Sequence, residues 1–397
     1  MNIALLTPRL PYPPDRGDRL TVFNLLRALA PRHRVTLFTF TDGTEPPRAR
    51  ERVAAHCASL ETIHLPRILS WLQAWFGIAS PLPSQVSYYR SSAMRDRVRA
   101  RVSADRFDLI VNHTIRMAPF SCGLPHPRKV LILGDALGMA LGRSLPFEPW
   151  WKRPGIRWER HRVDRFEAGI SRHYLETWAI SPDDRDDLIR IGCVNVVLVQ
   201  HGVDERLFDV VREPQAGPRV LFLGNLSVPH NVDAALFAAR EVWPHIRRTF
   251  PQARLVLAGA DPVPAVRQLA ALEGVEVTGT VADLMPVWAR ADVLLAPLRF
   301  STGIQNKVLE AMAAGVPVVT TPAVAGAIDA RDGEQLRVAE GAAGLARAVC
   351  ETLEDTMAAR GLAGRARDHV RARFSSGGYV DRLEKVVALS SPPVEGG

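Results

Sequence analysis

The sequence predicts an α/β protein built from two doubly wound domains. Short apolar runs alternate with helical patterns along the chain, which is typical of parallel sheets covered by helices. A chain of 397 residues with 47% hydrophobic content is too long for one ordinary core, so two domains are expected. Residues 201–218 are polar, contain prolines and lack periodicity, and we place the domain boundary there.

The first domain is expected over 1–205 and begins with a strand, a proline-rich loop (PRLPYPPDRGD) and a helix at 18–30. The loop lacks GxGxxG, so it is not a dinucleotide fingerprint. Gly17 and Asp18 lie in it at the carboxyl end of the first strand, where they form either a turn and a helix cap or a ligand contact. Further strands and a long charged helix are predicted from apolar runs and helical periodicity: strands 2–7, 34–40, 61–65, 107–112, 129–134, 176–181 and 194–200, and helix 150–174.

The strand at 107–112 ends at His113. A single histidine is usually packed or hydrogen-bonded in a core, but the carboxyl end of a parallel strand is also where sites gather. Both interpretations stay open for His113.

Residues 66–83 contain a cluster of large apolar side chains in a stretch too short to cross a bilayer. Core packing is the simpler interpretation, and peripheral contact with a membrane through 66–101 is the alternative. The arginines that follow favour membrane contact, because they would attract anionic lipid. A solvated helix face also explains these arginines. The apolar residues are Ile68, Leu69, Trp71, Leu72, Trp75 and Phe76, and the arginines are Arg90, Arg95, Arg97, Arg99, Arg101 and Arg106.

The net charge of +8 comes almost wholly from arginine and suits nucleic acid, anionic lipid or an anionic substrate. Nucleic acid is disfavoured because no helix-turn-helix, zinc-finger or RNA-binding-sheet signature accompanies the charge. The four cysteines are far apart without CxxC, so we expect them to be reduced and mostly buried in a cytoplasmic protein. The apolar run within residues 1–10 is too short for a signal peptide, so we expect this segment to form a strand.

A linker is expected over 206–217, a second domain over 218–374, and a crossover helix and tail over 375–397. The predicted strands are 219–223, 254–258, 275–278, 292–298, 316–321 and 335–338, and the last helices are 342–354, 357–373 and 378–389.

The stretch RFSTGIQNKVLEAMAAGVPVV, residues 299–319, carries the strongest signal. Thr302 as N-cap and Gln305 three residues later have the spacing of a capping box, and Gly315 with Pro317 ends the helix. A helix is therefore predicted over about 303–314.

One face of this helix carries Gly303, Asn306, Lys307 and Glu310 at i, i+3, i+4 and i+7. This helix face is either exposed to solvent, with a weak ion pair between Lys307 and Glu310, or part of a ligand-binding site. A helix start at the carboxyl end of a strand binds anions, and a lysine one turn in adds charge. A carboxylate one turn further suits sugar hydroxyls, so this face fits a nucleotide.

With these residues placed, the chain resembles the glycosyltransferase family 4 type of retaining sugar-nucleotide transferase with the GT-B fold. The most specific motif is GIQNKVLEAMAAGVPVV at 303–319, supported by PYPPDRGDRL, HGVD at 201–204, LGN at 223–225 and GTV at 279–281. The likeness is closer to the subgroup associated with bacterial exopolysaccharide systems. The resemblance implies two Rossmann-like domains facing a central cleft, with the last helix crossing back onto the first domain.

The resemblance also implies the roles of individual residues. Lys307, with the Gly303 and Ile304 amides, would hold the donor diphosphate, and Glu310 would hold the ribose. His113 would face the transferring sugar. The remaining implied substrate contacts are Gly17, Asp18, Gly224, Asn225, Thr280, Val281, Arg299 and Thr302.

Two features depart from the family pattern. Thr302 stands where the first of two glutamates is usual, and Asn225 with His230 or Asn231 replaces a basic pair. We hypothesise that Arg299 supplies part of the missing positive charge.

The expected activity is sugar transfer from a nucleotide diphosphate sugar to an acceptor hydroxyl with retention, in polysaccharide or glycoconjugate biosynthesis. No cofactor and no divalent metal are expected, since cationic side chains and no Asp-x-Asp pair lie beside the phosphate site. The expected acceptor is a saccharide or a lipid-linked molecule. The protein is expected in the cytoplasm or as a peripheral protein on the inner face of the membrane. The alternatives are an epimerase of the same fold and a non-catalytic nucleotide or nucleic-acid binder.

Overall fold

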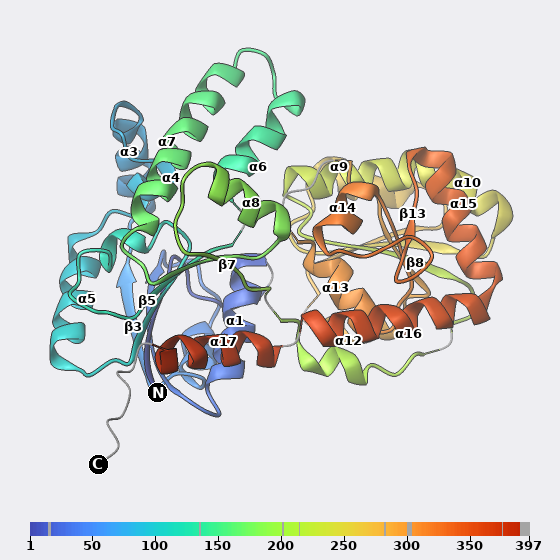
Figure 1. The fold of residues 1–397 in the computed structure, drawn as a ribbon. Coiled ribbons are helices and arrows are strands. Elements are labelled where there is room, and N and C mark those ends of the chain that lie inside the picture. The colour runs from blue at the N-terminus through green and yellow to red at the C-terminus, as the bar shows by residue number, and fades with distance from the viewer. Residues whose placement is uncertain are drawn as a thin grey trace. The chain divides into compact units, whose positions relative to one another are not determined.

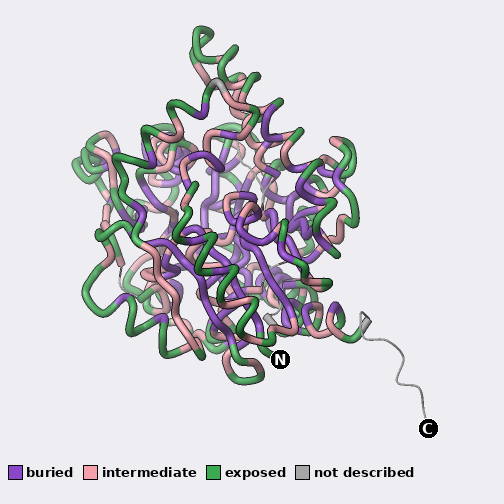
Figure 2. Tube along the Cα trace, turned by 90° about the vertical axis from the view of Figure 1, so that its left-hand side faces the viewer, coloured by how far each residue is buried: buried purple, intermediate pink, exposed green. Residues whose placement is uncertain are grey.

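The computed structural model describes residues 1–14, 17–134, 136–200, 202–213, 215–281, 283–299, 304–374 and 376–389. The chain forms two compact units, Met1–Gly202 with Ser376–Gly397, and Val203–Ser375. Each unit contains one parallel sheet with helices packed around it (Figure 1), which confirms the predicted α/β class. The inner strands of both sheets are buried along most of their length, as the purple segments inside Figure 2 show, whereas the edge strands are largely half-buried or exposed.

The first unit has a seven-stranded sheet in the order β3-β2-β1-β4-β5-β6-β7, in which every pairing is parallel. The order reverses between β1 and β4, so their carboxyl ends meet at a topological switch point. The strands are β1 (Asn2–Thr7), β2 (Arg34–Thr41), β3 (Ser59–His64), β4 (Leu109–His113), β5 (Lys129–Gly134), β6 (Glu176–Ala179) and β7 (Val196–Leu198).

The helices of this unit are α1 (Gly17–Leu29), α2 (Ala49–Ala54), α3 (Arg67–Phe76), α4 (Ser84–Tyr88), α5 (Ser92–Ala104), α6 (Leu137–Ser144), α7 (Arg153–Ser171), α8 (Pro182–Arg190) and α17 (Ser376–Leu389). Short 3-10 turns lie at η1 (Gly77–Ala79), η2 (Ala118–Phe120) and η3 (Leu145–Phe147).

The last helix, α17, packs into the first unit, as the sequence predicted. Tyr379 and Leu383 join the core cluster that contains the inward side chains of β1 and α1. The ring of Tyr379 meets Trp178 of β6 edge to face at a centroid distance of 5.0 Å. Arg382 forms an ion pair with Glu176 of the same strand. The first core is therefore completed by the end of the chain.

The second unit has a six-stranded parallel sheet in the order β10-β9-β8-β11-β12-β13, which reverses between β8 and β11. Its strands are β8 (Arg219–Leu223), β9 (Arg254–Ala258), β10 (Val275–Gly279), β11 (Val293–Ala296), β12 (Val318–Thr320) and β13 (Arg337–Val338). Its helices are α9 (Pro229–Phe237), α10 (Trp243–Thr249), α11 (Pro264–Arg267), α12 (Met285–Arg290), α13 (Asn306–Ala313), α14 (Pro322–Ala327), α15 (Gly341–Glu354) and α16 (Thr356–Arg373), with shorter turns η4 (Glu205–Asp209), η5 (Ala238–Val242) and η6 (Gln268–Ala271).

The start of α13 differs from the prediction. The helix begins at Asn306, and Gln305 is its N-cap in an extended conformation (φ −90°, ψ 99°). Ile304 and Gln305 are both 7% exposed, and the packing of these two side chains keeps the backbone extended where a capping box would need it helical. Thr302 and Gly303, the predicted cap and first helical residue, lie outside the described residues.

The core interpretation of residues 66–83 is wrong for α3, because Trp71 is 67% exposed, Trp75 71% and Phe76 75%. The buried residue of this helix is Ser70. The cysteines are all free, as expected, but only Cys193 is buried and the other three are half-buried. No helix in the described ranges is long and apolar enough to cross a membrane.

The placement of α17 predicts that Leu383→Ala destabilises the first unit. Leu383 is fully buried, and removing a buried leucine costs about 2–5 kcal/mol. Urea unfolding followed by tryptophan fluorescence should show a lower midpoint, since the buried Trp178 lies in the same cluster. Val211→Ala, at a residue 79% exposed in the second unit, is the matched control and should unfold like the wild type. An unchanged midpoint for Leu383→Ala would contradict the docking of this helix.

Candidate functional site

The predicted site residues of the second unit gather at the carboxyl edge of its sheet, beside the switch point between β8 and β11. Lys307 and Glu310 lie one turn apart on α13, and each is only 8% exposed. Buried charged side chains are rare unless they are paired or serve a site. The prediction of a solvated helix face is therefore wrong for these two residues.

Lys307 is held by two groups from the neighbouring β8 and α9. Its Nζ donates a hydrogen bond to Oδ1 of Asn231 and lies 4.9 Å from the centre of the Phe222 ring. Burial lowers the pKa of Lys307 to about 7, and the nearby Glu310 opposes this only in part. The ammonium is thus fixed in position but poorly compensated, which suits it to an incoming anion.

The carboxyl group of Glu310 has the opposite shift. Burial and, to a lesser extent, the negative charge of Asp204 raise its pKa to about 8, and the charge of Lys307 opposes this rise. Burial therefore disfavours the charged forms of both residues. A ligand that supplies negative charge to Lys307 and hydroxyl groups to Glu310 would relieve both penalties.

The loop after β8 shapes the other wall of this site. A Cβ at Gly224 would lie 2.9 Å from Cγ of Asn231, so any larger residue here would displace the Asn231 amide. Asn225 accepts hydrogen bonds from the Ser227 amide (3.0 Å) and hydroxyl (2.6 Å), and its carbonyl accepts one from Asn231 Nδ2 (3.0 Å). Asn231 is thereby oriented with its oxygen toward Lys307.

His230 adds no positive charge here, because burial and the charge of Lys307 lower its pKa to about 4. Arg299 follows β11 and is paired with Asp233 of α9, with Nε donating to Oδ2 at 3.0 Å. Its guanidinium also lies over the Phe237 ring at 5.0 Å. The charge of Arg299 is therefore partly neutralised by Asp233. Lys307 is more deeply buried than Arg299.

The other predicted site residues of this unit either lie near the carboxyl edge of the second sheet or are not among the residues that the structure describes. Thr280, exposed, and Val281, half-buried, follow β10, two strands away from β8. Ile304 is buried before α13. Thr302 and Gly303 are not among the described residues, so the predicted amide contacts to a diphosphate remain predictions.

The first unit holds the remaining predicted residues. His113 is the last residue of β4 and is 5% exposed. Gly17 is the exposed first residue of α1, and Asp18 in its first turn pairs with Arg9 at 3.7 Å. The structure places His113 at the end of β4 and Gly17 in the segment that follows β1, and these two strands meet at the switch point of this sheet.

Two residues near the site were missed by sequence reasoning. Phe222 is a buried residue of β8 that reads as ordinary core, and only the position of its ring below Lys307 gives it a second role. Asp204 belongs to the HGVD motif, but its influence on Glu310 depends on the fold. No sequence pattern links Phe222 to Lys307 or Asp204 to Glu310, because these pairs lie far apart along the chain.

Comparison with known proteins agrees with this architecture. Residues 217–355 match the family model described as Glycosyl transferases group 1, and this region contains Lys307, Glu310 and Asn231. No curated protein sequence matches the chain at a significant level.

Many solved structures resemble almost the whole chain, and three of them illustrate the range. HepE of Anabaena, in complex with UDP and glucose, is 17% identical, with 98% of this chain and 100% of that chain covered and a TM-score of 0.70. Sucrose-phosphate synthase of Thermosynechococcus elongatus is 19% identical, with 98% and 100% covered and a TM-score of 0.71. A putative UDP-N-acetylglucosamine 2-epimerase of Listeria monocytogenes is 12% identical, with 97% and 95% covered and a TM-score of 0.63. The chain thus has the two-domain GT-B fold, and its residues 217–355 carry the signature of group 1 glycosyl transferases.

Proposed function

We propose that this protein is a glycosyltransferase that moves a sugar from a nucleotide diphosphate sugar to an acceptor hydroxyl with retention of anomeric configuration. The observation that carries the proposal is the buried Lys307 and Glu310 pair at the carboxyl edge of the second sheet, inside the matched family region. The fold shared with HepE, whose solved complexes contain UDP with glucose and UDP-glucose, supports a nucleotide-sugar donor.

In this proposal, Lys307 binds the donor diphosphate. Negative charge grows on the diphosphate as the glycosidic bond breaks, so a fixed ammonium stabilises the transition state more than the ground state. Asn231 and Phe222 hold the ammonium in place before the donor arrives. Loss of one such contact costs about 3 kcal/mol of transition-state stabilisation, or about two orders of magnitude in rate.

Glu310 binds the ribose hydroxyls of the donor. Its pKa of about 8 in the free protein means that the carboxyl group starts mostly protonated at neutral pH. Hydroxyl donors stabilise the carboxylate form, so binding of a ribose diol would lower this pKa. Thr280 and Val281 are proposed to flank the base, and Gly303 and Ile304 to donate amides to the diphosphate.

The first domain is proposed to bind the acceptor side, with His113 facing the transferring sugar and Gly17 and Asp18 in the adjoining loop. The leaving phosphate would accept the proton of the acceptor hydroxyl on the same face of the sugar, so no separate base is needed. We propose no divalent metal, because Lys307 supplies positive charge at the diphosphate. The donor domain then corresponds to 218–374 and the acceptor domain to 1–205.

A role in polysaccharide or glycoconjugate biosynthesis, a cytoplasmic location and a saccharide or lipid-linked acceptor belong to the same proposal. The family 4 type and its exopolysaccharide subgroup, which the GIQNKVLEAM motif suggests, belong to it as well. The rival is an epimerase of the same fold, as the Listeria structure illustrates. An epimerase would convert the sugar of the donor without any second substrate, whereas a transferase leaves free nucleoside diphosphate and a glycosylated acceptor.

Nucleotide diphosphate sugars are expected to raise the melting temperature of the protein, since they bind only its folded state. A panel of UDP-, GDP- and ADP-sugars identifies the donor.

The variant Lys307→Ala should lower the affinity for this donor, or the transfer rate, by about two orders of magnitude. Arg299→Ala should cause a smaller loss, because Asp233 already neutralises this side chain. Unchanged affinity for Arg299→Ala would reject its compensating role, and no response to any donor would reject the proposed function.

The pKa of Lys307 predicts a pH dependence for binding of the donor product UDP. Its value of about 7 in the free protein means that the ammonium is lost as pH rises above that value. A bound diphosphate favours the ammonium, so binding takes up a proton and UDP affinity should fall by up to about tenfold per pH unit above pH 7. Ionisation of Glu310 near pH 8 acts in the opposite direction, because ribose hydroxyls favour its carboxylate form, but it affects UDP and uridine alike.

Calorimetric titrations from about pH 7 to 9 measure this effect, with uridine as the control ligand that lacks the diphosphate. Lys307→Arg is the matched variant, since a guanidinium stays charged and should flatten the profile. A wild-type profile as flat as that of Lys307→Arg would contradict the assignment.

The same burial predicts that Lys307→Met stabilises the free protein at low pH. The folded pKa lies below the value of 10.5 for an exposed lysine, so the buried ammonium costs stability fully below pH 7, and the cost declines as pH rises toward 10.5. Thermal unfolding at about pH 6 should show a higher melting temperature for Lys307→Met than for the wild type, with the difference shrinking by about pH 9. An equal or lower melting temperature at pH 6 would show that the ammonium is well compensated.

A further inference from the structure

Five of the eight tryptophans are exposed, and all five lie in the first unit on α3, on α7 or just before α7. The exposed fractions are large: Trp71 67%, Trp75 71%, Trp150 80%, Trp151 63% and Trp158 53%. The other three, Trp178, Trp243 and Trp288, are 0–2% exposed in the cores of the two units. The chain therefore confines its exposed indole rings to α3, α7 and the segment just before α7, which together we call the tryptophan surface.

The helix α3 has the reverse of the usual surface pattern. Its one buried residue is Ser70, while its large apolar side chains point to solvent and include Ile68 at 80% and Phe76 at 75% exposure. A helix that stabilised the core would bury this face. An exposed apolar patch of this kind marks an interaction site.

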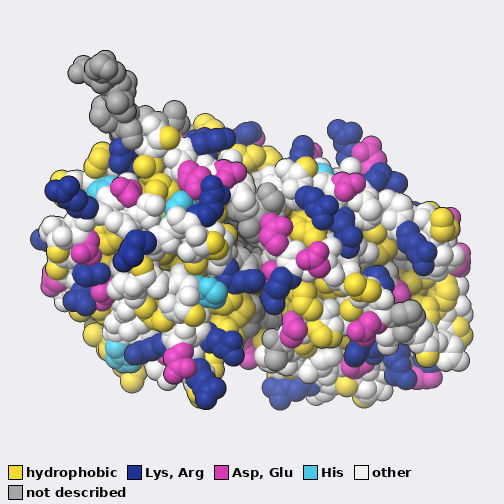
Figure 3. Space-filling view, turned by 90° about the horizontal axis from the view of Figure 1, so that it is seen from below, with side chains coloured by type: hydrophobic (Ala, Val, Ile, Leu, Met, Phe, Trp, Pro, Cys, Tyr) yellow, Lys and Arg dark blue, Asp and Glu magenta, His cyan; other side chains and the backbone are white. Residues whose placement is uncertain are grey.

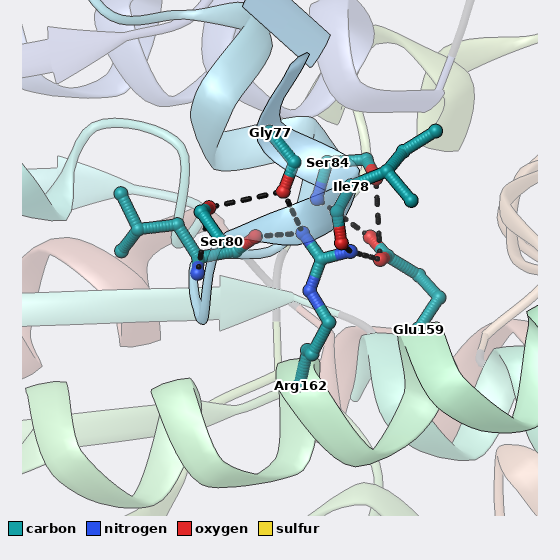
Figure 4. Close-up of polar contacts among 7 residues, drawn as sticks. Gly77, Ile78, Ser80, Ser84, Glu159 and Arg162 are labelled. Atoms are coloured by element: carbon teal, nitrogen blue, oxygen red, sulfur yellow. Dashed lines mark hydrogen bonds and ion pairs between the residues drawn. The ribbon is translucent and has the colours of Figure 1, made fainter. Parts of the chain in front are cut away.

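The tryptophan surface is held rigidly by a buried arginine. Arg162 of α7, 3% exposed, donates hydrogen bonds to the carbonyl oxygens of Gly77 at 2.8 Å and Ile78 at 3.2 Å, directly after α3. Glu159 of α7 accepts from the amide of Ser84 at 2.7 Å. Figure 4 shows these side chains reaching from one helix to the turn beyond α3. In Figure 1 the α6–α7 hairpin extends away from the sheet.

The charge of this surface is positive. Residues 143–165 contain seven lysines and arginines against three acidic residues, and residues 66–78 contain Arg67 and no acidic residue. The three acidic residues are each paired with a basic neighbour: Glu148 with Lys152, Glu159 with Arg162, and Asp164 with Arg160. Arg157 and Arg165 of α7 are exposed. By contrast, the face of the molecule in Figure 3 mixes basic and acidic side chains.

We propose that the tryptophan surface docks on an anionic lipid bilayer. Tryptophan is the residue enriched at membrane interfaces, because its ring packs among acyl chains while its N–H stays near the headgroups. Exposed arginines beside it attract anionic headgroups. The positive charge favours this occupant over a second copy of the same surface, which would bring like charges together. The contact is peripheral, and it goes beyond the proposed transfer reaction because none of these residues belongs to the donor site.

The surface differs from the one expected from the sequence. That prediction joined α3 to the arginines of α5, but Arg97 and Arg101 pair with Glu61 of β3. The structure instead ties the turn after α3 to α7 through Arg162, and Trp158 of α7 lies about eighty residues further along the chain than α3.

Vesicle co-sedimentation of the full chain tests the proposal. Binding is expected to vesicles of phosphatidylcholine with about a third phosphatidylglycerol, and to be weaker with phosphatidylcholine alone and at high salt. The double variant Trp71→Ser with Trp75→Ser should lower the partition coefficient at least about tenfold. The variant Arg157→Gln should weaken binding to the anionic vesicles while leaving binding to neutral vesicles unchanged.

Val211→Ser and Met357→Ser are matched controls, because these residues are 79% and 74% exposed in the second unit and should leave vesicle binding unchanged. Melting temperatures show that each variant is folded. Lack of wild-type sedimentation, or equal sedimentation of the double variant, would overturn the proposal. So would a wild-type dimer in light scattering that the double variant converts to a monomer without any lipid binding. The response to nucleotide sugars without vesicles tests the transferase proposal separately.

Discussion

The burial of the Lys307 ammonium is the constraint around which the second unit is organised. A lysine in this position needs an acceptor, and Asn231 supplies it from α9. Asn231 can lie there because Gly224 has no side chain and the turn at Asn225 provides a carbonyl for its amide. A single buried charge thus dictates a glycine, a turn and the approach of one helix.

The sheet topology explains why these residues meet. Strands β8 and β11 are neighbours in the sheet although about seventy residues separate them, so the helices that follow them, α9 and α13, start at the same edge. The arrangement costs stability, since Lys307 and Glu310 are both buried in an environment that disfavours their charges. Such local costs are typical of sites that await a ligand.

Much of this architecture could be predicted from the sequence. The apolar runs at 2–7, 129–134, 219–223 and 254–258 coincide with β1, β5, β8 and β9, because strands buried on both faces are continuous apolar segments. The helix with Lys307 and Glu310 was also predicted, but its start was placed too early. Packing of Ile304 and Gln305, which local capping rules do not include, decides that boundary. The outward face of α3 could not be predicted either, since composition cannot distinguish a buried apolar cluster from an exposed one.

The return of α17 to the first unit has a consequence for how the chain folds. The core that contains Leu26 and Trp178 includes Tyr379 and Leu383, which are synthesised after the whole of the second unit. The residues of Val203–Ser375 are all synthesised earlier, so the second unit can reach its native packing while the first still lacks a helix. A nascent or truncated chain would therefore expose an unfinished hydrophobic face in its amino-terminal half, and this is where chaperones would be expected to act.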